Sequence, residues 1–328
     1  MSHETIRQEV LKIEAKDVEV PKENQKHVDV LFLEVDGLHV HKQNSSRSTR
    51  EVKLGIVHEG WEKKHPSSKE YTLKNKSYWR SFDKGEEFWE SFSQHLYSQY
   101  ALSKDTPIVI NGDAAPWIRK GVDFFEHAIY TYDRYHLKKW IKRALSNRSK
   151  QERRKAYLRA DNNDPVALLV AIAEAEKAED DEEKKKEIAD LRLFIYENQD
   201  AFRDYREILK EKGIDTTEMR PMGAAESNMN LFSRRLKKMG YSWSREGLES
   251  MVDALIHQFE GTLMEAIQNQ SSSETGNEKK PKKFPSFAKL LTQKTRESIG
   301  AIQGHLPALT RDDQRKPYTR ALRGLVGF

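Results

Sequence analysis

Two aspartates lie within or directly after hydrophobic runs that predict buried β-strands. Asp36 stands in Leu33-Glu-Val-Asp-Gly37, part of the most hydrophobic run of the chain, and Asp113 ends the shorter run Ile110-Asn-Gly-Asp113. A carboxylate in such a position is costly to bury unless a partner compensates its charge. Each aspartate alone could also be a turn or helix-cap residue, which is common at strand ends. Two of them on neighbouring strands favour a shared site, because loops at strand ends collect functional residues.

Carboxylates gathered at one edge of a sheet suit hard divalent cations, and Mg²⁺ prefers oxygen ligands. Two such ions can activate an attacking oxygen and stabilise a leaving oxygen during phosphodiester cleavage. A site of this kind needs a third acid, for which Glu226 is the candidate. It begins a predicted helix, at the edge of the buried stripe that contains Met229, Phe232 and Leu236. The alternative is an acid that only interacts favourably with the helix dipole.

Four further side chains each have a functional and a structural interpretation. His136 could orient an acid or contact a phosphate, or be a packed histidine of the core. Asp133 is either an auxiliary acid or the cap of the helix that follows it. Glu34 shares strand parity with Asp36 and could lie near the metal ions, although one acid per strand is the usual arrangement. Trp243 could stack on a nucleic-acid base, or pack as an indole beneath a helix pair.

Basic residues are unevenly distributed along the chain, whose net charge is +5 and whose pI is near 9.0. Residues 134–159 hold eleven Lys and Arg against one acid, whereas residues 176–190 hold eight acids against four Lys. The basic block is either a surface that faces a polyanion or an ordinary solvated helix face. The residues expected to position DNA through its phosphates are Arg134, Lys138, Lys139, Lys142 and Arg143 and, beside the third acid, Arg234, Arg235, Lys237 and Lys238.

The composition excludes several classes of protein. With 13 Phe, 12 Tyr and 6 Trp in 328 residues, the chain can form a sizeable core and is not disordered as a whole. The absence of Cys excludes disulfides and thiolate metal sites and agrees with a reducing compartment. No apolar stretch is long enough for a spanning helix, and the N-terminus lacks the core of a signal peptide. We therefore expect a soluble, cytoplasmic protein with no membrane partner.

The predicted order of elements is three strands followed by helix, strand, helix, strand and helix. Strands are predicted at 28–40, 51–59, 70–82, 107–113 and 127–132, and helices at 84–100, 116–125 and 134–145. Three sequential strands with short turns favour an antiparallel meander, to which the later strands are added in parallel. This order predicts an α/β fold with an RNase-H-like mixed sheet flanked by helices.

The rest of the chain predicts a helical insertion and two less regular ends. Residues 150–212 show helical periodicity and no strand, so an all-helical insertion should precede the last catalytic helix. Further helices are predicted at 2–16, 225–240 and 246–267. The expected divisions are an N-terminal remnant and linker at 1–26, a catalytic domain at 27–148 and 220–267, a helical insertion domain at 149–219, and a basic, partly disordered region at 268–328.

Three short motifs occur in order: Leu-Glu-Val-Asp-Gly at 33–37, Asn-Gly-Asp-Ala at 111–114 and Ala-Glu-Ser-Asn at 225–228. Together they resemble the DDE motif of the ISLre-type bacterial insertion-sequence transposases, which are relatives of the Mutator-like group. Asp133-Arg-Tyr-His136 resembles the Cys/Asp-x-x-His element of that group, and Ser242-Trp-Ser244 is a further match. The resemblance covers roughly residues 1–267, and the long separation of the second and third acids fits the helical domain inserted in this group.

The resemblance implies a DDE transposase in which Asp36, Asp113 and Glu226 hold two Mg²⁺ or Mn²⁺ ions and His136 assists catalysis. The implied partners are double-stranded DNA, as insertion-sequence ends and target, and further copies of the chain in a homodimer or higher assembly on DNA. Such a protein would be associated with the bacterial nucleoid.

The same resemblance also raises an expectation of truncation. Members of the group usually carry a long N-terminal DNA-binding region, and residues 2–8 resemble the end of a recognition helix, so we expect a truncated chain. One alternative is therefore a DNA-binding remnant that does not transpose. Another is an RNase-H-like nuclease of housekeeping type, which fits the acids but gives no reason for the helical insertion.

Overall fold

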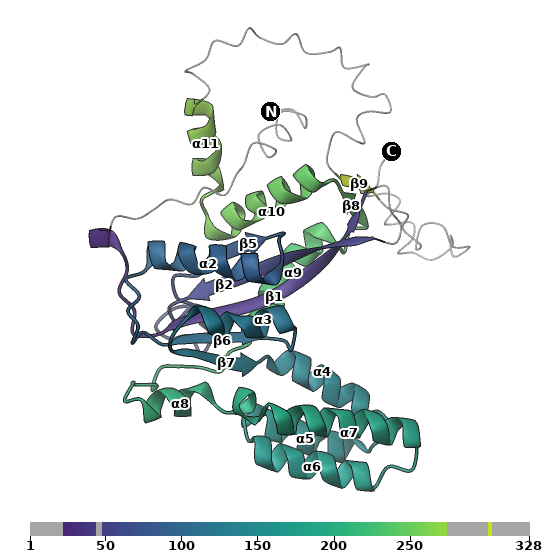
Figure 1. Ribbon diagram of the computed structural model, residues 1–328. Coiled ribbons are helices and arrows are strands. Elements are labelled where there is room, and N and C mark those ends of the chain that lie inside the picture. The colour runs from purple at the N-terminus through teal and green to yellow at the C-terminus, as the bar shows by residue number, and fades with distance from the viewer. Residues whose placement is uncertain (1–21, 44–47, 274–300, 304–328) are drawn as a thin grey trace. The chain divides into compact units, whose positions relative to one another are not determined.

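The computed structural model describes residues 22–43, 48–273 and 301–303 (Figure 1). The helix predicted at 2–16 and most of the predicted C-terminal region lie outside these residues. The chain divides into two compact units, the larger of which comprises residues 17–37 and 52–229. All the predicted metal ligands belong to this larger unit.

A mixed sheet with strand order β5–β2–β1–β6–β7 forms the centre of the larger unit. β5 pairs antiparallel with β2, whereas β6 pairs parallel with β1 on one side and with β7 on the other. The strands are β1 (Leu31–Lys42), β2 (Thr49–His58), β5 (Ser77–Ser81), β6 (Ile108–Gly112) and β7 (Ala128–Tyr132). Parallel strands thus extend the antiparallel pair of β2 and β5, and the α/β fold class with its mixed sheet is confirmed.

Both faces of β1 are covered, so its hydrophobic run is continuous where a one-sided strand would alternate. The odd-numbered residues from Leu31 to Val35 pack into the core formed with α2 (Gly85–Gln99). Val30 and Phe32 pack on the opposite face, in a cluster that contains Tyr205. Because successive side chains of a strand point to opposite faces, Glu34 and Asp36 lie on the face of Phe32.

The helices that flank the sheet follow from the hydrophobic spacing of the sequence. α2 buries Phe88, Trp89, Phe92 and Leu96 at helical spacing against the sheet. The helix predicted at 116–125 is shorter than expected: α3 (Pro116–Arg119) gives way to a 3₁₀ turn, η2 (Lys120–Phe124). α4 (Arg134–Ala144) begins directly after β7, as predicted.

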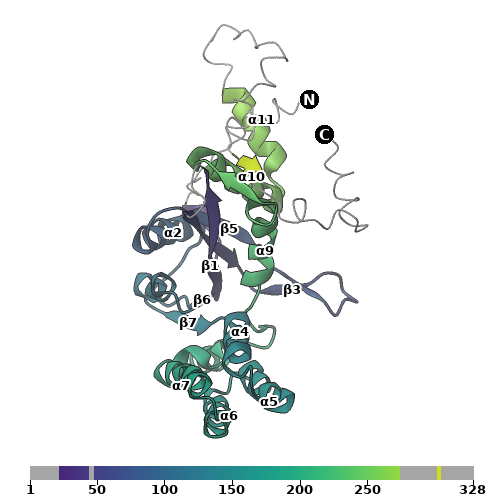
Figure 2. The same cartoon turned by 90° about the vertical axis from the view of Figure 1, so that its right-hand side faces the viewer.

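The strand predicted at 70–82 is divided. Its first part, β4 (Tyr71–Leu73), pairs with β3 (Trp61–Lys63) in a separate two-stranded ribbon, and its second part is β5. Asn75 lies between them with a φ of 49°, a left-handed conformation that ends an extended strand. Figure 2 shows the ribbon projecting from the sheet on the side opposite α2.

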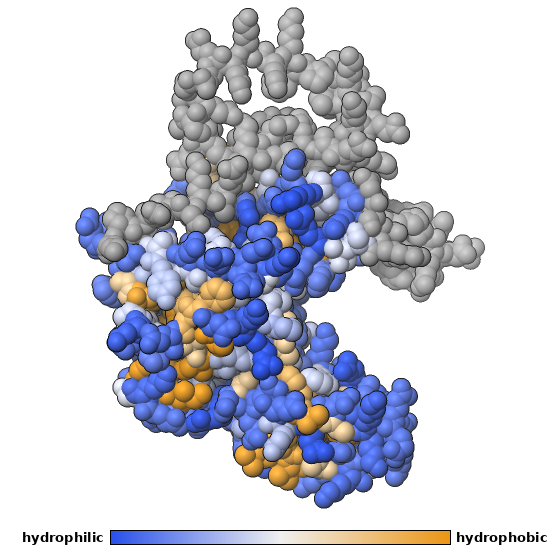
Figure 3. Space-filling model, in the orientation of Figure 1, coloured by the Kyte–Doolittle hydropathy of each residue, from blue (hydrophilic) through white to orange (hydrophobic). Residues whose placement is uncertain are grey.

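Between α4 and residue 212 the chain forms only helices and turns, and irregular chain then leads to the last predicted catalytic helix. The helical part contains α5 (Lys150–Asp161), α6 (Pro165–Lys177), α7 (Glu182–Glu197), the 3₁₀ turn η3 (Gln199–Phe202) and α8 (Tyr205–Glu211). α4 to α7 share one core, to which Ile141, Ile172 and Leu191 contribute. Much of this segment is hydrophilic in Figure 3, with apolar surface at its lower edge, and Val166 and Val170 of α6 are exposed.

α9 (Ala225–Leu236) and the elements that follow it differ in two places from the prediction. The helix predicted at 246–267 is divided into α10 (Arg245–Glu260) and α11 (Leu263–Ser273) by Gly261, whose φ of 78° ends α10. A short strand that was not predicted, β8 (Tyr241–Trp243), pairs parallel with the end of β1 and antiparallel with β9 (Ala301–Gln303). Trp243 is buried and donates its indole N–H to the carbonyl of Leu236 at 2.8 Å, which agrees with a packed indole.

Within the described part of the chain, no helix combines the length and apolar character needed to cross a membrane.

Candidate metal centre

Asp36 and Asp113 lie at the same level of two neighbouring parallel strands. The register of β1 and β6 places Glu34 opposite Asn111, and each aspartate follows two residues later in the same direction. Both carboxylates are half-buried. The parallel register therefore brings the two predicted acids together at the carboxyl edge of the sheet.

The turn after β6 is fixed by close packing and by hydrogen bonds. Gly112 allows β6 to approach β1, since a Cβ at this position would lie 2.8 Å from the carbonyl oxygen of Val35. The Oδ1 atom of Asp113 accepts a hydrogen bond from the N–H of Ala115 at 2.9 Å, and the hydroxyl of Tyr130 donates to the backbone carbonyl of Asp113 at 2.6 Å. The glycine of Asn-Gly-Asp thus allows the backbones of β6 and β1 to lie close together, and the aspartate begins a tight turn that hydrogen bonds hold in place.

His136 reaches the same edge from the first turn of α4. Asp133 caps this helix: it is 1% exposed, and its carboxylate accepts the N–H of His136 at 3.1 Å and the side-chain amide of Asn111 at 3.2 Å. These contacts agree with the interpretation of Asp133 as the cap of α4. The spacing Asp-x-x-His brings the imidazole one turn beyond a capped helix start, beside the two aspartates.

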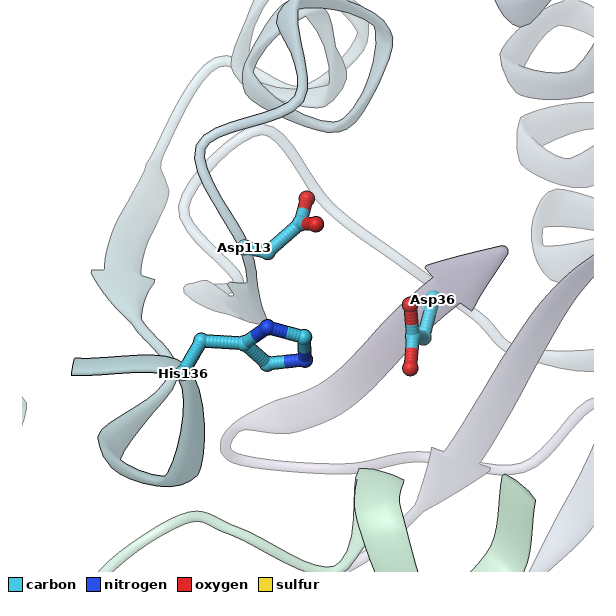
Figure 4. Close-up of side chains that lie close together, drawn as sticks. All are labelled: Asp36, Asp113 and His136. Atoms are coloured by element: carbon cyan, nitrogen blue, oxygen red, sulfur yellow. The ribbon is translucent and has the colours of Figure 1, made fainter. Parts of the chain in front are cut away.

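Asp36, Asp113 and His136 each offer one ligand atom, and these three atoms lie within 4.8 Å of one another. Figure 4 shows the three side chains converging from β1, from the turn after β6 and from the start of α4. All three are half-buried, so solvent and a ligand can still reach them. Two carboxylates and an imidazole at this spacing can coordinate one divalent ion.

Burial and neighbouring acids disfavour the ionised form of Asp36. Burial raises the pKa of Asp36 to about 6 from an ordinary value of 3.8, and the negative charges of Asp113 and Asp133 act in the same direction. The hydrogen bond from the N–H of Gly37 at 2.7 Å and the electrostatic interaction with His136 act in the opposite direction, but the pKa of Asp36 stays raised. A bound cation would reverse the imbalance, since it favours the ionised carboxylate.

The two glutamates considered in the sequence differ from this group. Glu226 is half-buried in the first turn of α9 and is not a member of the three-residue group, so its role as a ligand stays a prediction. Glu34 is fully buried, and its carboxylate accepts backbone N–H groups at the start of α9. Sequence reasoning treated His136 as a catalytic residue and not as a ligand, although its spacing from Asp133 could have suggested one.

The predicted basic residues of α4 divide into two groups. Lys138 pairs with Asp161 of α5 at 2.6 Å, and Arg134 is half-buried, which lowers its pKa despite the nearby charge of Asp161. The other three, Lys139, Lys142 and Arg143, line an open hollow of about 600 Å³ together with His136.

The second basic set, at the end of α9, also differs from residue to residue. The guanidinium of Arg235 lies 5.0 Å from the ring centroid of Tyr241, and Lys238 donates to Asn230 at 2.7 Å. Arg234 and Lys237 are exposed. These residues belong to the smaller unit, so their role in DNA binding stays a prediction.

The sequence model of one family, described as "Uncharacterised protein family (UPF0236)", matches residues 1–272. The chain belongs to the UPF0236 family. A UPF0236 protein of Caldanaerobacter subterraneus subsp. tengcongensis is 31% identical over 243 residues, which are 73% of this chain and 49% of that protein. A second protein of that organism has the same identity and coverage. The names of these two relatives join eleven and four locus designations, respectively.

A more distant UPF0236 relative is the protein in the vanSb 3′ region of Streptococcus gallolyticus. It is 26% identical over 272 residues, which are 80% of this chain and 57% of that protein. The chain thus spans about half the length of the curated relatives it matches. Among solved structures, the Drosophila P element transposase strand transfer complex is similar over 84% of this chain and 75% of that chain, with 11% identity and a TM-score of 0.27. At this TM-score the likeness carries no argument about function.

Proposed function

We propose that this UPF0236 protein is the catalytic domain of a DDE-type DNA transposase of the ISLre type, which cleaves and joins phosphodiester bonds at insertion-sequence ends. The observation that carries the proposal is the convergence of Asp36, Asp113 and His136 at the carboxyl edge of a mixed sheet. The ordered motifs around Asp36, Asp113 and Glu226 support the finer assignment, because they resemble that group in sequence and in order.

The donor set fits a divalent ion that prefers oxygen but tolerates nitrogen. Carboxylates favour Mg²⁺ and Mn²⁺, and an imidazole makes Mn²⁺ the better match of the two. Asp36, Asp113 and His136 would hold the first ion. A second ion needs another carboxylate, which Glu226 would supply from α9. The two ions would supply activation of the attacking oxygen and stabilisation of the leaving oxygen.

The surface beside the candidate centre suits a phosphate backbone. Lys139, Lys142 and Arg143 line the same hollow as His136, on one face of α4. Contacts of this kind position DNA and contribute affinity that depends on salt, without reading base sequence. They would hold a DNA strand across the three side chains of the centre.

The names of the relatives favour a mobile element over a housekeeping nuclease. An enzyme that moves its own gene leaves the same coding sequence at many places in a genome. One C. subterraneus relative joins eleven locus designations in a single name, and another joins four. A housekeeping nuclease gives no reason for such repetition.

Metal-dependent nicking of supercoiled plasmid DNA tests the proposal. We expect the wild-type chain to nick in Mn²⁺ and in Mg²⁺, and to lose the activity with EDTA. Asp36→Asn and Asp113→Asn should abolish nicking, because each removes a charged ligand. The matched control is Asp180→Asn, which changes an exposed acid between α6 and α7 and should leave the rate unchanged.

Full nicking by Asp36→Asn in the presence of EDTA would show that the proposed chemistry is wrong. A wild-type chain that binds DNA but nicks in neither metal would favour the alternative, a DNA-binding remnant that does not transpose. Measurement of both DNA binding and DNA nicking thus separates an active catalytic domain from a DNA-binding remnant.

A further inference from the structure

The helix that carries Glu226 begins without a capping side chain of its own. The carbonyl of Ala224 accepts the first helical hydrogen bond, from the N–H of Asn228 at 3.1 Å, so Ala224 occupies the N-cap position of α9. Alanine has no side-chain oxygen, whereas Ser, Thr, Asp or Asn at this position would satisfy one of the free N–H groups of the first turn. Those N–H groups therefore need an acceptor from elsewhere in the fold.

Glu34 of β1 supplies this acceptor. One carboxylate oxygen accepts the N–H of Ala225 at 2.6 Å, and the other accepts the N–H of Gly223 at 3.3 Å. Gly223 has a φ of 141°, which other residues rarely adopt, and this conformation accompanies an N–H directed at the carboxylate. A side chain 189 residues away in the sequence thus acts as the cap of α9.

The carboxylate of Glu34 is fully buried, so the hydrogen bonds that it accepts from the start of α9 are shielded from water. The Nε2 atom of His58 is buried, lies 3.8 Å from Glu34 and has no hydrogen-bond partner in the described structure. A negative charge at a helix N-terminus is further stabilised by the helix dipole.

A second anchor holds the same turn of α9 to another strand of the sheet, β5. The side-chain oxygen of Asn228 accepts hydrogen bonds from the hydroxyl of Tyr78 at 2.6 Å and from Lys76 at 3.1 Å. Its side-chain nitrogen donates to the carbonyl of Ala224 at 2.8 Å. The first turn of α9 is therefore fixed to β1 through Glu34 and to β5 through Tyr78.

We propose that Glu34 is a positioning residue, which holds Glu226 at the distance from Asp36 and Asp113 that a second metal ion requires. Glu34 lies two residues before Asp36 on the same strand face, and the N–H it accepts belongs to the residue directly before Glu226. One buried carboxylate thus links the strand that carries the first acid to the turn that carries the third. Tyr78 assists from β5. This inference rests on the proposed two-ion function.

Titration of the full chain with Mn²⁺, followed by electron paramagnetic resonance of the free ion, tests the proposal. The wild type should bind two ions. Glu34→Gln keeps the shape but places an amide where a charged acceptor faces two N–H donors, so the second ion should bind about ten- to a hundredfold more weakly. The first ion, held by Asp36, Asp113 and His136, should bind with affinity close to that of the wild type.

The matched control is Glu179→Gln. Glu179 is also buried and also accepts an N–H near a helix start, from Asp181 at 3.2 Å before α7, so its replacement perturbs a similar contact outside the site. Binding of both ions should be unchanged. A role of Glu34 in stability alone would weaken both ions together or neither, whereas the proposal requires a selective loss of the second.

Tyr78→Phe provides a milder variant in case Glu34→Gln does not fold. It removes one hydroxyl from the second anchor and should weaken the second ion by a smaller factor in the same direction. Two ions bound with wild-type affinity by folded Glu34→Gln, or by Tyr78→Phe where Glu34→Gln does not fold, would overturn the inference. A wild type that binds one ion would also overturn it, and a wild type that binds none would instead contradict the proposed function.

Discussion

Glu34 and Asp36 are two acids on the same face of one strand, and the protein treats them in opposite ways. Glu34 is fully buried and accepts two backbone N–H groups from the start of α9, and its pKa is lowered. Asp36 is half-buried and accepts the N–H of its own neighbour Gly37, and its pKa is raised to about 6 by burial. The charge of Glu34 is compensated by the fold, whereas that of Asp36 is not.

This difference separates a structural carboxylate from one prepared for a ligand. A buried charge that is already satisfied by hydrogen bonds gains little from a metal ion. A carboxylate with a raised pKa next to a second acid has an energetic deficit that a cation removes. Strand parity alone could not distinguish the two acids, because both point to the same side of β1.

The largest expected contrast between the two acids is in the rate of DNA cleavage. Asp36→Asn should reduce nicking by a factor of about a thousand or more, because a lost metal ion removes several kcal/mol of transition-state stabilisation. Glu34→Gln should reduce it by about ten- to a hundredfold, since it acts through the position of Glu226. Single-turnover nicking rates in saturating Mn²⁺ measure both. Equal losses of nicking rate in the two variants would contradict the proposed difference between a metal ligand, Asp36, and a positioning residue, Glu34.

The next contrast is in folding stability, where Glu34 should matter most. Glu34→Gln should lower the free energy of unfolding of the metal-free protein by about 2 kcal/mol at pH 7, the usual worth of hydrogen bonds to a charged group. Because the folded pKa of Glu34 is lowered, this stabilisation is present above the ordinary value of 4.5 and is lost as the pH falls through the folded value. Urea unfolding at pH 7 and at acid pH measures the difference, which should shrink in acid.

Asp36→Asn should raise the free energy of unfolding in the same urea assay, whereas Glu34→Gln lowers it. A folded pKa near 6 against an ordinary 3.8 means that wild-type stability is fully present below about pH 4 and is lost as the pH rises through about 6. Asp36→Asn removes this loss, so the metal-free variant should be more stable than the wild type by about 3 kcal/mol at pH 7.5. Added Mn²⁺ should reverse the order, because it binds the folded wild type. If metal-free Asp36→Asn were less stable than the wild type, the proposal that the charge of Asp36 is uncompensated would be wrong.

The smallest effect concerns the basic residues of α4 next to the site. Replacement of Lys142 and Arg143 together by Ala should weaken duplex DNA binding uniformly across sequences. The slope of log K against log salt should fall by about 0.9 for each phosphate that the variant no longer neutralises. Lys185→Ala, on the acid-rich helix α7, is the control and should leave the slope unchanged. An unchanged slope in the double variant would place the DNA elsewhere.

Much of the site's framework was predictable from local sequence. Periodicity and turn chemistry predicted three features: the hydrophobic runs that contain Asp36 and Asp113, the Asn-Gly-Asp turn, and the order of the strands. The parallel pairing of β1 and β6 then brings the two aspartates to one edge without further information.

Other features depend on contacts between distant segments. The capping of α9 by Glu34 joins residues 191 positions apart, so no local pattern could separate this acid from Asp36. The break of the predicted strand at Asn75 follows from a single left-handed residue. Gly261, by contrast, was a visible stop signal between α10 and α11 that the helical periodicity on either side obscured.

The most direct measurement is the position of bound Mn²⁺, from anomalous diffraction of crystals soaked in the ion. We expect one ion within about 2.3 Å of carboxylate oxygens from both Asp36 and Asp113 and beside the imidazole of His136, and a second ion shared with Glu226. No ion should approach Glu34, whose oxygens are occupied by backbone N–H groups. An ion bound at Glu34, or no ion at Asp36 and Asp113 in saturating Mn²⁺, would contradict the proposed metal centre.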